Sequence, residues 1–231
     1  MTSETPTLVL DLDGTLVDTA SDLVGTLNFI LERQGATPLA FDPARGMVGH
    51  GARAMLEAGL EASKLAASPE RVEVLFNEFV AYYADHIADT SRPFPGALAA
   101  LDRFAAAGWT LAICTNKLES LSRQLLGRLG LADRFAVIAG QDTYGVRKPD
   151  PRHLTETIRS AGGNSRRAVM VGDSEVDIAT AQAARIPVVG VSFGYSPVPL
   201  AEFRPDRIID HYDALYDTAT ALIAVPEYRA G

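Results

Sequence analysis

The sequence contains a single cysteine, Cys114, among its 231 residues. An intrachain disulfide and a zinc site built from several thiolates are therefore excluded, and this cysteine usage suits a reducing compartment. Long apolar segments are also missing, because no run of about 18 or more apolar residues occurs that could span a membrane. The first residues, Met1 to Pro6, lack the apolar core of a secretory signal. We therefore expect a cytoplasmic protein with no membrane partner.

Positive charge is scarce relative to negative charge. The chain carries 29 acidic and 21 basic side chains, which leaves a formal net charge of −8 with histidine neutral. A chain of this sign binds nucleic acid poorly through nonspecific phosphate contacts, so we expect no nucleic-acid partner. Hydrophobic residues make up 47% of the chain, which excludes disordered and low-complexity classes and indicates a globular protein.

Short, fully apolar runs indicate β-strands that are buried on both faces, because none of them alternates apolar with polar residues. These runs lie at residues 8–10, 111–113, 137–138, 169–171 and 188–191, with a weaker run at 208–209. Helical patterns fall between them, at residues 97–107, 118–129, 151–161 and 175–184. Strands that alternate with helices in this way predict an α/β fold with a doubly wound, Rossmann-like parallel sheet.

The connection after the first strand is far longer than a single crossover helix needs. About 100 residues separate the first two apolar runs, and this stretch has helical patterns only. Residues 72–87, for example, make one apolar helix face. We therefore predict an all-α helical cap domain at residues 19–92, inserted into a catalytic core formed by residues 1–18 and 93–231.

The first apolar run ends in two aspartates, Asp11 and Asp13, which are followed by Gly14. Carboxylates two residues apart at a strand end point to the same side, and the glycine permits a sharp departure of the chain. Such a pair can bind a divalent cation, or it can divide into a nucleophile and a general acid. The alternative is a turn in which the aspartates cap local amides, and the motif taken alone favours that alternative.

Later runs are followed by residues suited to an anion. Thr115, Asn116 and Lys117 stand where a helix begins, which is a position for binding anions, although a plain helix cap explains them when they are taken alone. Lys148 precedes another helix and could balance a phosphate and several carboxylates. The alternative for Lys148 is an exposed loop lysine, which is the usual place of this residue type.

Asp173 and Asp177 follow the fourth run, one helical turn apart on the same helix face. They can hold Mg²⁺ directly or through water, or they can simply favour the helix N-terminus. All four segments, however, lie at or just after the carboxyl ends of predicted parallel strands, where ligand sites of open α/β sheets are found. Because several unpaired acids gathered at one edge are costly, we expect a single site that holds a cation.

In order and spacing, these motifs resemble those of the haloacid dehalogenase-like hydrolase superfamily. The resemblance covers essentially the whole chain, and its four parts are Asp-x-Asp-Gly-Thr-Leu-Val-Asp at residues 11–18, Thr115, Lys148-Pro149 and Gly-Asp-x-x-x-Asp at residues 172–177. It implies a Mg²⁺-dependent phosphatase that acts on a small phosphorylated metabolite through an aspartyl-phosphate intermediate.

The resemblance also implies a role for each matching residue. Asp11 would attack phosphorus, and Asp13 would protonate the leaving group and then activate water. Thr115 and the backbone amide of Asn116 would bind the phosphoryl oxygens, while Lys148 would neutralise developing charge.

For the metal, the resemblance implies Mg²⁺ held by Asp11, by the backbone carbonyl of Asp13 and by Asp173. Asp177 would act on the ion directly or through water. The second aspartate of the first motif favours a phosphatase or a phosphomutase over a dehalogenase, because a halide leaving group needs no acid.

The glycine-rich segment at residues 49–53 resembles the cap loop of phosphoglycolate phosphatases, with His50 in place of the asparagine that is common there. This resemblance implies 2-phosphoglycolate as the substrate, with His50, Gly51 and Arg53 as substrate-binding candidates. Arg53 could pair with a substrate carboxylate, or it could lie exposed on a helix, and the sequence favours neither. Lys117 and Arg45 are further candidates for the same anion.

Other functions stay open at this point. Within the enzyme class they are a sugar-phosphate phosphatase, a pyrophosphatase and a β-phosphoglucomutase-like enzyme. Phosphonate-cleaving relatives use a cap lysine, and Lys64 is the one lysine in the predicted cap. A different class is a binding or regulatory protein that kept the fold without turnover, which the complete motif set argues against. The sequence does not indicate the oligomeric state.

Overall fold

A parallel sheet of six strands forms the centre of the computed structural model, which describes residues 5–49 and 51–224. The strand order is β5-β4-β1-β6-β7-β8, and every neighbouring pair in this sheet is parallel. The strands are β1 (Thr7–Leu10), β4 (Thr110–Cys114), β5 (Val137–Ala139), β6 (Ala168–Gly172), β7 (Val188–Val191) and β8 (Arg207–Ile209). Because the order reverses at β1, the carboxyl ends of β1, β4 and β6 adjoin one another.

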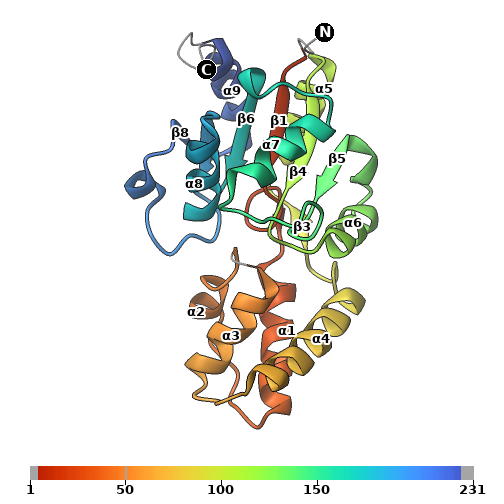
Figure 1. Ribbon diagram of the computed structural model, residues 1–231, viewed down its shortest axis with the longest axis vertical. Coiled ribbons are helices and arrows are strands. Elements are labelled where there is room, and N and C mark those ends of the chain that lie inside the picture. Colours follow the sequence, from red (N-terminus) through yellow and green to blue (C-terminus); the bar gives the residue numbers. More distant parts are fainter. Residues whose placement is uncertain (1–4, 50, 225–231) are drawn as a thin grey trace.

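Helices cover both faces of this sheet (Figure 1). In β1, Leu8 and Leu10 belong to one buried cluster, while Val9 belongs to a second cluster with Leu154 and Ile158. Alternate residues of the strand therefore face opposite helical layers, which is why its sequence is apolar throughout. The covering helices are α5 (Ala97–Ala106), α6 (Glu119–Arg128), α7 (Pro151–Ser160), α8 (Glu175–Ala184) and α9 (Leu215–Ala224). The predicted doubly wound α/β sheet is confirmed.

Four further helices lie beyond the carboxyl end of the sheet (Figure 1). They are α1 (Ala20–Arg33), α2 (Phe41–Arg45), α3 (Ala52–Ala62) and α4 (Pro69–Asp85). The α4 helix buries Leu75, Phe79 and Tyr83 on one face, and α1 and α3 are the helices that it packs against. Burial of this apolar stripe explains why a helical period dominates the sequence of this segment.

The chain leaves the sheet for these helices and returns from them at one place. The short strand β2 (Val17–Asp18) pairs antiparallel with β3 (Arg92–Pro93), so the outgoing and returning segments lie side by side. Short 3₁₀ turns complete the described chain: η1 (Ala132–Arg134), η2 (Ser165–Arg167), η3 (Leu200–Phe203) and η4 (Tyr212–Ala214). Within residues 5–49 and 51–224, no helix has the length and apolar character to cross a membrane.

Candidate active site

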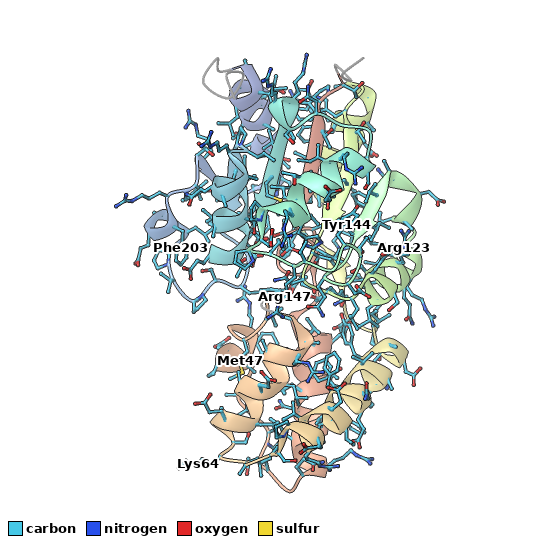
Figure 2. The ribbon with its side chains drawn as sticks, viewed as in Figure 1. Met47, Lys64, Arg123, Tyr144, Arg147 and Phe203 are labelled. Carbon is cyan, nitrogen blue, oxygen red and sulfur yellow. The ribbon has the colours of Figure 1, made fainter. Side chains whose placement is uncertain are left out.

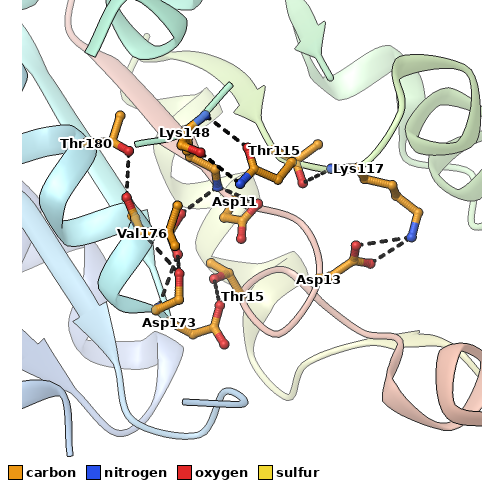
Figure 3. Close-up of polar contacts among 12 residues, drawn as sticks. Asp11, Asp13, Thr15, Thr115, Lys117, Lys148, Asp173, Val176 and Thr180 are labelled. Atoms are coloured by element: carbon orange, nitrogen blue, oxygen red, sulfur yellow. Dashed lines mark hydrogen bonds and ion pairs between the residues drawn. The ribbon is translucent and has the colours of Figure 1, made fainter. Parts of the chain in front are cut away.

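Asp11, Thr115 and Asp173 follow β1, β4 and β6, and the sheet brings them together at its carboxyl edge (Figure 3). Lys148, from the loop before α7, joins them. Its ammonium lies 2.9 Å from Asp11 Oδ1 and donates a hydrogen bond of 2.5 Å to Asp177 Oδ1. All five side chains are buried. The strand ends, the loop before α7 and the start of α8 therefore bring these five predicted site residues together in one buried cluster.

Negative charge exceeds positive charge in this cluster. Carboxylate oxygens of Asp11, Asp173 and Asp177 all lie within 4.8 Å of one another, and Lys148 supplies one positive charge. Burial raises the pKa of Asp11 to about 6, although Lys148 opposes the shift. Burial, together with the charges of Asp177 and Asp11, raises the pKa of Asp173 to about 8. The site therefore favours additional positive charge.

One oxygen of the cluster suits a metal ligand in particular. Asp11 Oδ1 is buried and makes no directed hydrogen bond; its contact with Lys148 is an ion pair. Lys148 meets this oxygen with one positive charge, but it shares that charge with Asp177, so the three buried carboxylates together still favour a further cation. Clustered carboxylate oxygens are the donors that hard divalent cations such as Mg²⁺ prefer. The residues present therefore fit a divalent cation.

Asp173 is held by both of its oxygens. Thr15 Oγ1 donates to Oδ1 over 3.0 Å, and the backbone N–H of Tyr195 donates to Oδ2 over 2.7 Å. Gly14 passes close to the same carboxylate with a φ of +81°, and a Cβ there would lie 2.5 Å from Asp173 Oδ2. This contact explains why the first motif needs a glycine at that point. Tyr195 stands in the loop after β7, where no local sequence pattern indicates this contact with Asp173.

Asp177 serves two purposes at once. It forms a capping box with Ser174 at the start of α8, where Ser174 Oγ donates to Asp177 Oδ2 over 2.6 Å. Its other oxygen accepts the hydrogen bond from Lys148. The helix-cap interpretation of this residue is therefore correct, and it is compatible with a role in the site because the two use different oxygens.

Asn116 fixes the position of Lys148. Its Nδ2 donates to the carbonyl oxygen of Lys148 over 3.1 Å, and the N–H of Lys148 donates to Asn116 Oδ1 over 3.0 Å. Thr115 Oγ1 accepts a hydrogen bond from the N–H of Lys117 over 3.2 Å. The side-chain amide of Asn116 is thus used within the protein, which leaves its backbone as the group for an anion.

Asp13 is turned away from the buried acids and toward Lys117 (Figure 3). Lys117 Nζ donates to Asp13 Oδ1 and Oδ2 over 3.0 and 3.1 Å, and Thr19 Oγ1 donates to Oδ1 over 2.8 Å. The side chain of Asp13 therefore takes no part in the acidic cluster. Its position, separate from Asp11, is compatible with general acid chemistry on a group bound between them.

A pocket lies between the sheet edge and the four helices beyond it. Core residues and helical residues both line it: Asp11, Asp13, Leu23, Val48, Gly49, Gly51, Ala52, Met55, Tyr83, Thr115, Asn116, Lys117, Leu118, Leu121 and Gln141. Asp11 and Asp13 stand on its wall together. A small molecule in this pocket would meet both carboxylates at once.

The glycine-rich loop contributes to the pocket through its backbone. Gly51 has a φ of +93°, and a Cβ at this position would lie 3.0 Å from the carbonyl oxygen of Asn116. The loop therefore approaches the core closely, as its glycines allow. His50, the neighbouring candidate, lies outside the described residues.

The arginine and lysine candidates from the helical segment point elsewhere. Arg53 donates to Glu73 Oε2 over 2.5 Å, and its guanidinium lies 4.3 Å from the ring centroid of Phe76. It is absent from the pocket wall described above, because α4 offers it both a charge and an aromatic face. Arg45 donates to the carbonyl oxygen of Gly194 over 2.7 Å. Lys64 is exposed at the far end of the helices (Figure 2).

Comparisons with known proteins agree with this geometry. Residues 8–191 match the family model described as haloacid dehalogenase-like hydrolase. A phosphoglycolate phosphatase of Mesorhizobium japonicum is 51% identical over 210 residues, covering 91% of this chain and 92% of the relative. One from Caulobacter vibrioides is 42% identical over 226 residues, covering 97% and 95%. A crystal structure described as a predicted phosphoglycolate phosphatase from Haemophilus somnus has a TM-score of 0.87 at 25% identity, covering 94% of this chain and 98% of that one. The chain belongs to the haloacid dehalogenase-like hydrolase family.

Proposed function

We propose that this protein is a Mg²⁺-dependent phosphatase that hydrolyses 2-phosphoglycolate to glycolate and phosphate. The observation that carries the proposal is the buried Asp11 carboxylate, which faces a pocket beside Lys148 and two further acids. The relatives from Mesorhizobium japonicum and Caulobacter vibrioides, 51% and 42% identical, are named phosphoglycolate phosphatase, which supports this substrate.

The reaction proceeds in two displacements at phosphorus. A carboxylate oxygen of Asp11 bonds to phosphorus while the bond to the ester oxygen breaks, and Asp13 in its protonated form gives that oxygen its proton. Glycolate leaves, and Asp11 carries the phosphoryl group. Asp13 then takes a proton from a water molecule as the water attacks phosphorus, which releases phosphate and regenerates Asp11.

Three groups bind the phosphoryl oxygens during both steps. They are the Thr115 hydroxyl, the backbone N–H of Asn116 and the ammonium of Lys148. The reciprocal hydrogen bonds between Asn116 and Lys148 keep this set in place before substrate arrives. Fixed donors of this kind stabilise the charge that develops on the phosphoryl group, which is the main requirement of phosphoryl transfer.

Asp11, the backbone carbonyl of Asp13 and Asp173 would hold the Mg²⁺ ion. Both oxygens of Asp177 already accept hydrogen bonds, from Lys148 and from Ser174, which supports a role for Asp177 through water. When bound, the ion supplies positive charge that polarises a phosphoryl oxygen.

Residues 19–92 serve as a cap domain over a core of residues 1–18 and 93–231. The pocket wall supports this division, because Leu23, Val48 and Met55 face Asp11 and Asp13 across it. A cap in this position excludes water from the reacting phosphoryl group and selects substrates by size.

The proposal is tested by Asp11→Asn, which keeps the shape of the side chain and removes its nucleophilic charge. Phosphate release from 2-phosphoglycolate with Mg²⁺ should fall at least about a thousandfold in kcat/KM, or about 4 kcal/mol of transition-state stabilisation. Circular dichroism should show an unchanged fold. A folded variant that retains activity would refute the mechanism. A wild type that releases no phosphate would refute it too and would favour a binding or regulatory protein without turnover. Sugar phosphates, pyrophosphate and p-nitrophenyl phosphate serve as comparison substrates.

A further inference from the structure

Lys117 stands on the pocket wall beyond Asp13, with its side chain 5% exposed. Its ammonium contacts the Asp13 carboxylate and also donates to Tyr83 Oη over 2.9 Å. The same ammonium lies 4.3 Å from the centroid of the Tyr83 ring. An ammonium has three N–H donors that rotate together, so it can serve a further oxygen in the pocket.

Tyr83 reaches this point from α4, on the opposite side of the pocket from the sheet. Among the described residues, its hydroxyl oxygen accepts from Lys117 and makes no other hydrogen bond. Burial, followed by the charge of Asp13, raises the pKa of Tyr83 well above its ordinary value. The hydroxyl therefore keeps its proton, and this proton is available to an acceptor in the pocket.

The rest of the pocket wall offers little else to a charged group. Of the described residues that line it, Lys117 is the one cation. Beyond the sheet, Leu23 and Met55 from the helices and Val48 from the segment between α2 and α3 present apolar side chains, which cannot bind an anion. Arg53 is held by Glu73, as described above. Among the described side chains of the pocket wall, Lys117 is therefore the cation that an anionic group of the substrate, other than the phosphoryl group, can meet.

We propose that Lys117 and Tyr83 form the subsite that binds the carboxylate of the substrate and so determine specificity. This proposal rests on the proposed function. In 2-phosphoglycolate a single carbon separates the carboxylate from the ester oxygen that Asp13 protonates. A group bonded to Asp13 is therefore within reach of that carboxylate. The substrate carboxylate accepts from Lys117 Nζ in place of one Asp13 oxygen, and it accepts a second hydrogen bond from Tyr83 Oη.

The test compares 2-phosphoglycolate with 2-hydroxyethyl phosphate, in which a neutral CH₂OH group replaces the carboxylate. The measured quantity is the ratio of kcat/KM for the two esters with Mg²⁺. The wild type should prefer 2-phosphoglycolate by about a hundredfold, equivalent to about 2.7 kcal/mol. Lys117→Gln should lower this ratio at least tenfold, and Lys117→Arg should keep most of it. Tyr83→Phe, which removes one hydroxyl, should lower the ratio several-fold.

Arg71→Gln is the matched control. It removes the same charge from the helix that carries Tyr83, at an exposed position where Arg71 bonds to Gln34. The ratio should stay at the wild-type value. Equal losses for both esters in Lys117→Gln would overturn the proposal, because Lys117 would then only orient Asp13. If Lys117→Gln does not fold, Tyr83→Phe and Lys117→Arg test the carboxylate subsite by the same measurement, the ratio of kcat/KM for the two esters.

Hydrolysis of the two esters by the wild type distinguishes a failure of the carboxylate subsite from a failure of the proposed function. Hydrolysis of both esters at equal rates would overturn the carboxylate subsite and leave the phosphatase chemistry standing. Hydrolysis of neither ester would overturn both. A second phosphate group offers similar oxygens to Lys117, so pyrophosphate is included as a third substrate. One possible result is that the wild type hydrolyses pyrophosphate faster than 2-phosphoglycolate and that Lys117→Gln removes this preference. This result would assign the subsite to a phosphate group and overturn the carboxylate proposal.

Discussion

At the scale of single residues, the position of Asp173 depends on neighbours that never touch a substrate. The hydroxyl of Thr15 donates to one of its oxygens over 3.0 Å in a buried setting. Thr15→Val keeps the side-chain shape and deletes this donor. Because outer partners orient metal-binding carboxylates, we expect Mg²⁺ affinity to fall about tenfold. Isothermal titration calorimetry of the metal-free protein with Mg²⁺ measures this change directly.

Thr26→Val is the matched control for that experiment. Thr26 is also buried, but its hydroxyl donates to the carbonyl oxygen of Asp22 within α1. We expect this variant to alter stability slightly and to leave Mg²⁺ affinity at the wild-type value. Equal losses of affinity in both variants would show that the effect is general and that Thr15 does not orient Asp173.

Much of the candidate site could be predicted from single residues, because strand ends fix where they lie. Asp11, Thr115 and Asp173 follow apolar runs, and a parallel sheet necessarily gathers their positions at one edge. The partners of long side chains could not be predicted in this way. Arg53 meets Glu73 and Lys117 meets Asp13, and these pairs join distant segments whose packing no local pattern reports.

At the scale of elements, Asp22 joins the start of α1 to the segment that returns to β3. Its carboxylate accepts from the N–H and hydroxyl of Thr90 and from the N–H and hydroxyl of Ser91. Asp22→Asn replaces one acceptor oxygen with a donor that faces other donors. We expect the free energy of unfolding to fall by about 1–3 kcal/mol. Urea denaturation at pH 7 measures it.

Acid should weaken the same link. Despite partial burial, the hydrogen bonds from Ser91 and Thr90 hold the pKa of Asp22 below its ordinary value. The contribution of Asp22 to the free energy of unfolding is therefore present above the unfolded-state pKa and is lost as the pH falls through the lower, folded-state pKa.

The control for Asp22→Asn is Asp133→Asn, at an exposed aspartate in η1, which should change the free energy of unfolding by less than about 0.5 kcal/mol. An equal change in both variants would contradict a specific role for Asp22.

The elements themselves were largely predictable, for reasons that differ between sheet and helices. The central strands are buried on both faces, so an apolar run is enough to find them. The helices α1 and α4 carry long apolar stripes, whereas α2 spans only Phe41–Arg45 and has too few turns to show a period. The pairing of β2 with β3 involves two residues from each strand, which leaves no pattern in the sequence.

At the scale of the whole molecule, the acidic cluster links stability to both pH and Mg²⁺. An unfolded aspartate has a pKa of about 3.9, while burial raises the pKa of Asp11 to about 6 and that of Asp173 to about 8. Between these values the metal-free folded chain binds more protons than the unfolded chain. The contribution of this cluster to the free energy of unfolding should therefore be fully present below about pH 4 and should be lost as the pH rises toward 8.

Mg²⁺ competes with those protons, so its stabilising effect should grow with pH. At a concentration about a hundredfold above its dissociation constant, a ligand of the folded state adds about 2.7 kcal/mol. Calorimetric melting with Mg²⁺ or with a chelator should show a larger gain in Tm at pH 8.5 than at pH 5.5. Asp173→Asn removes one of the titrating groups, so its metal-free Tm should depend less on pH and gain less from Mg²⁺. An equal gain at both pH values would mean that the cation does not bind at these carboxylates.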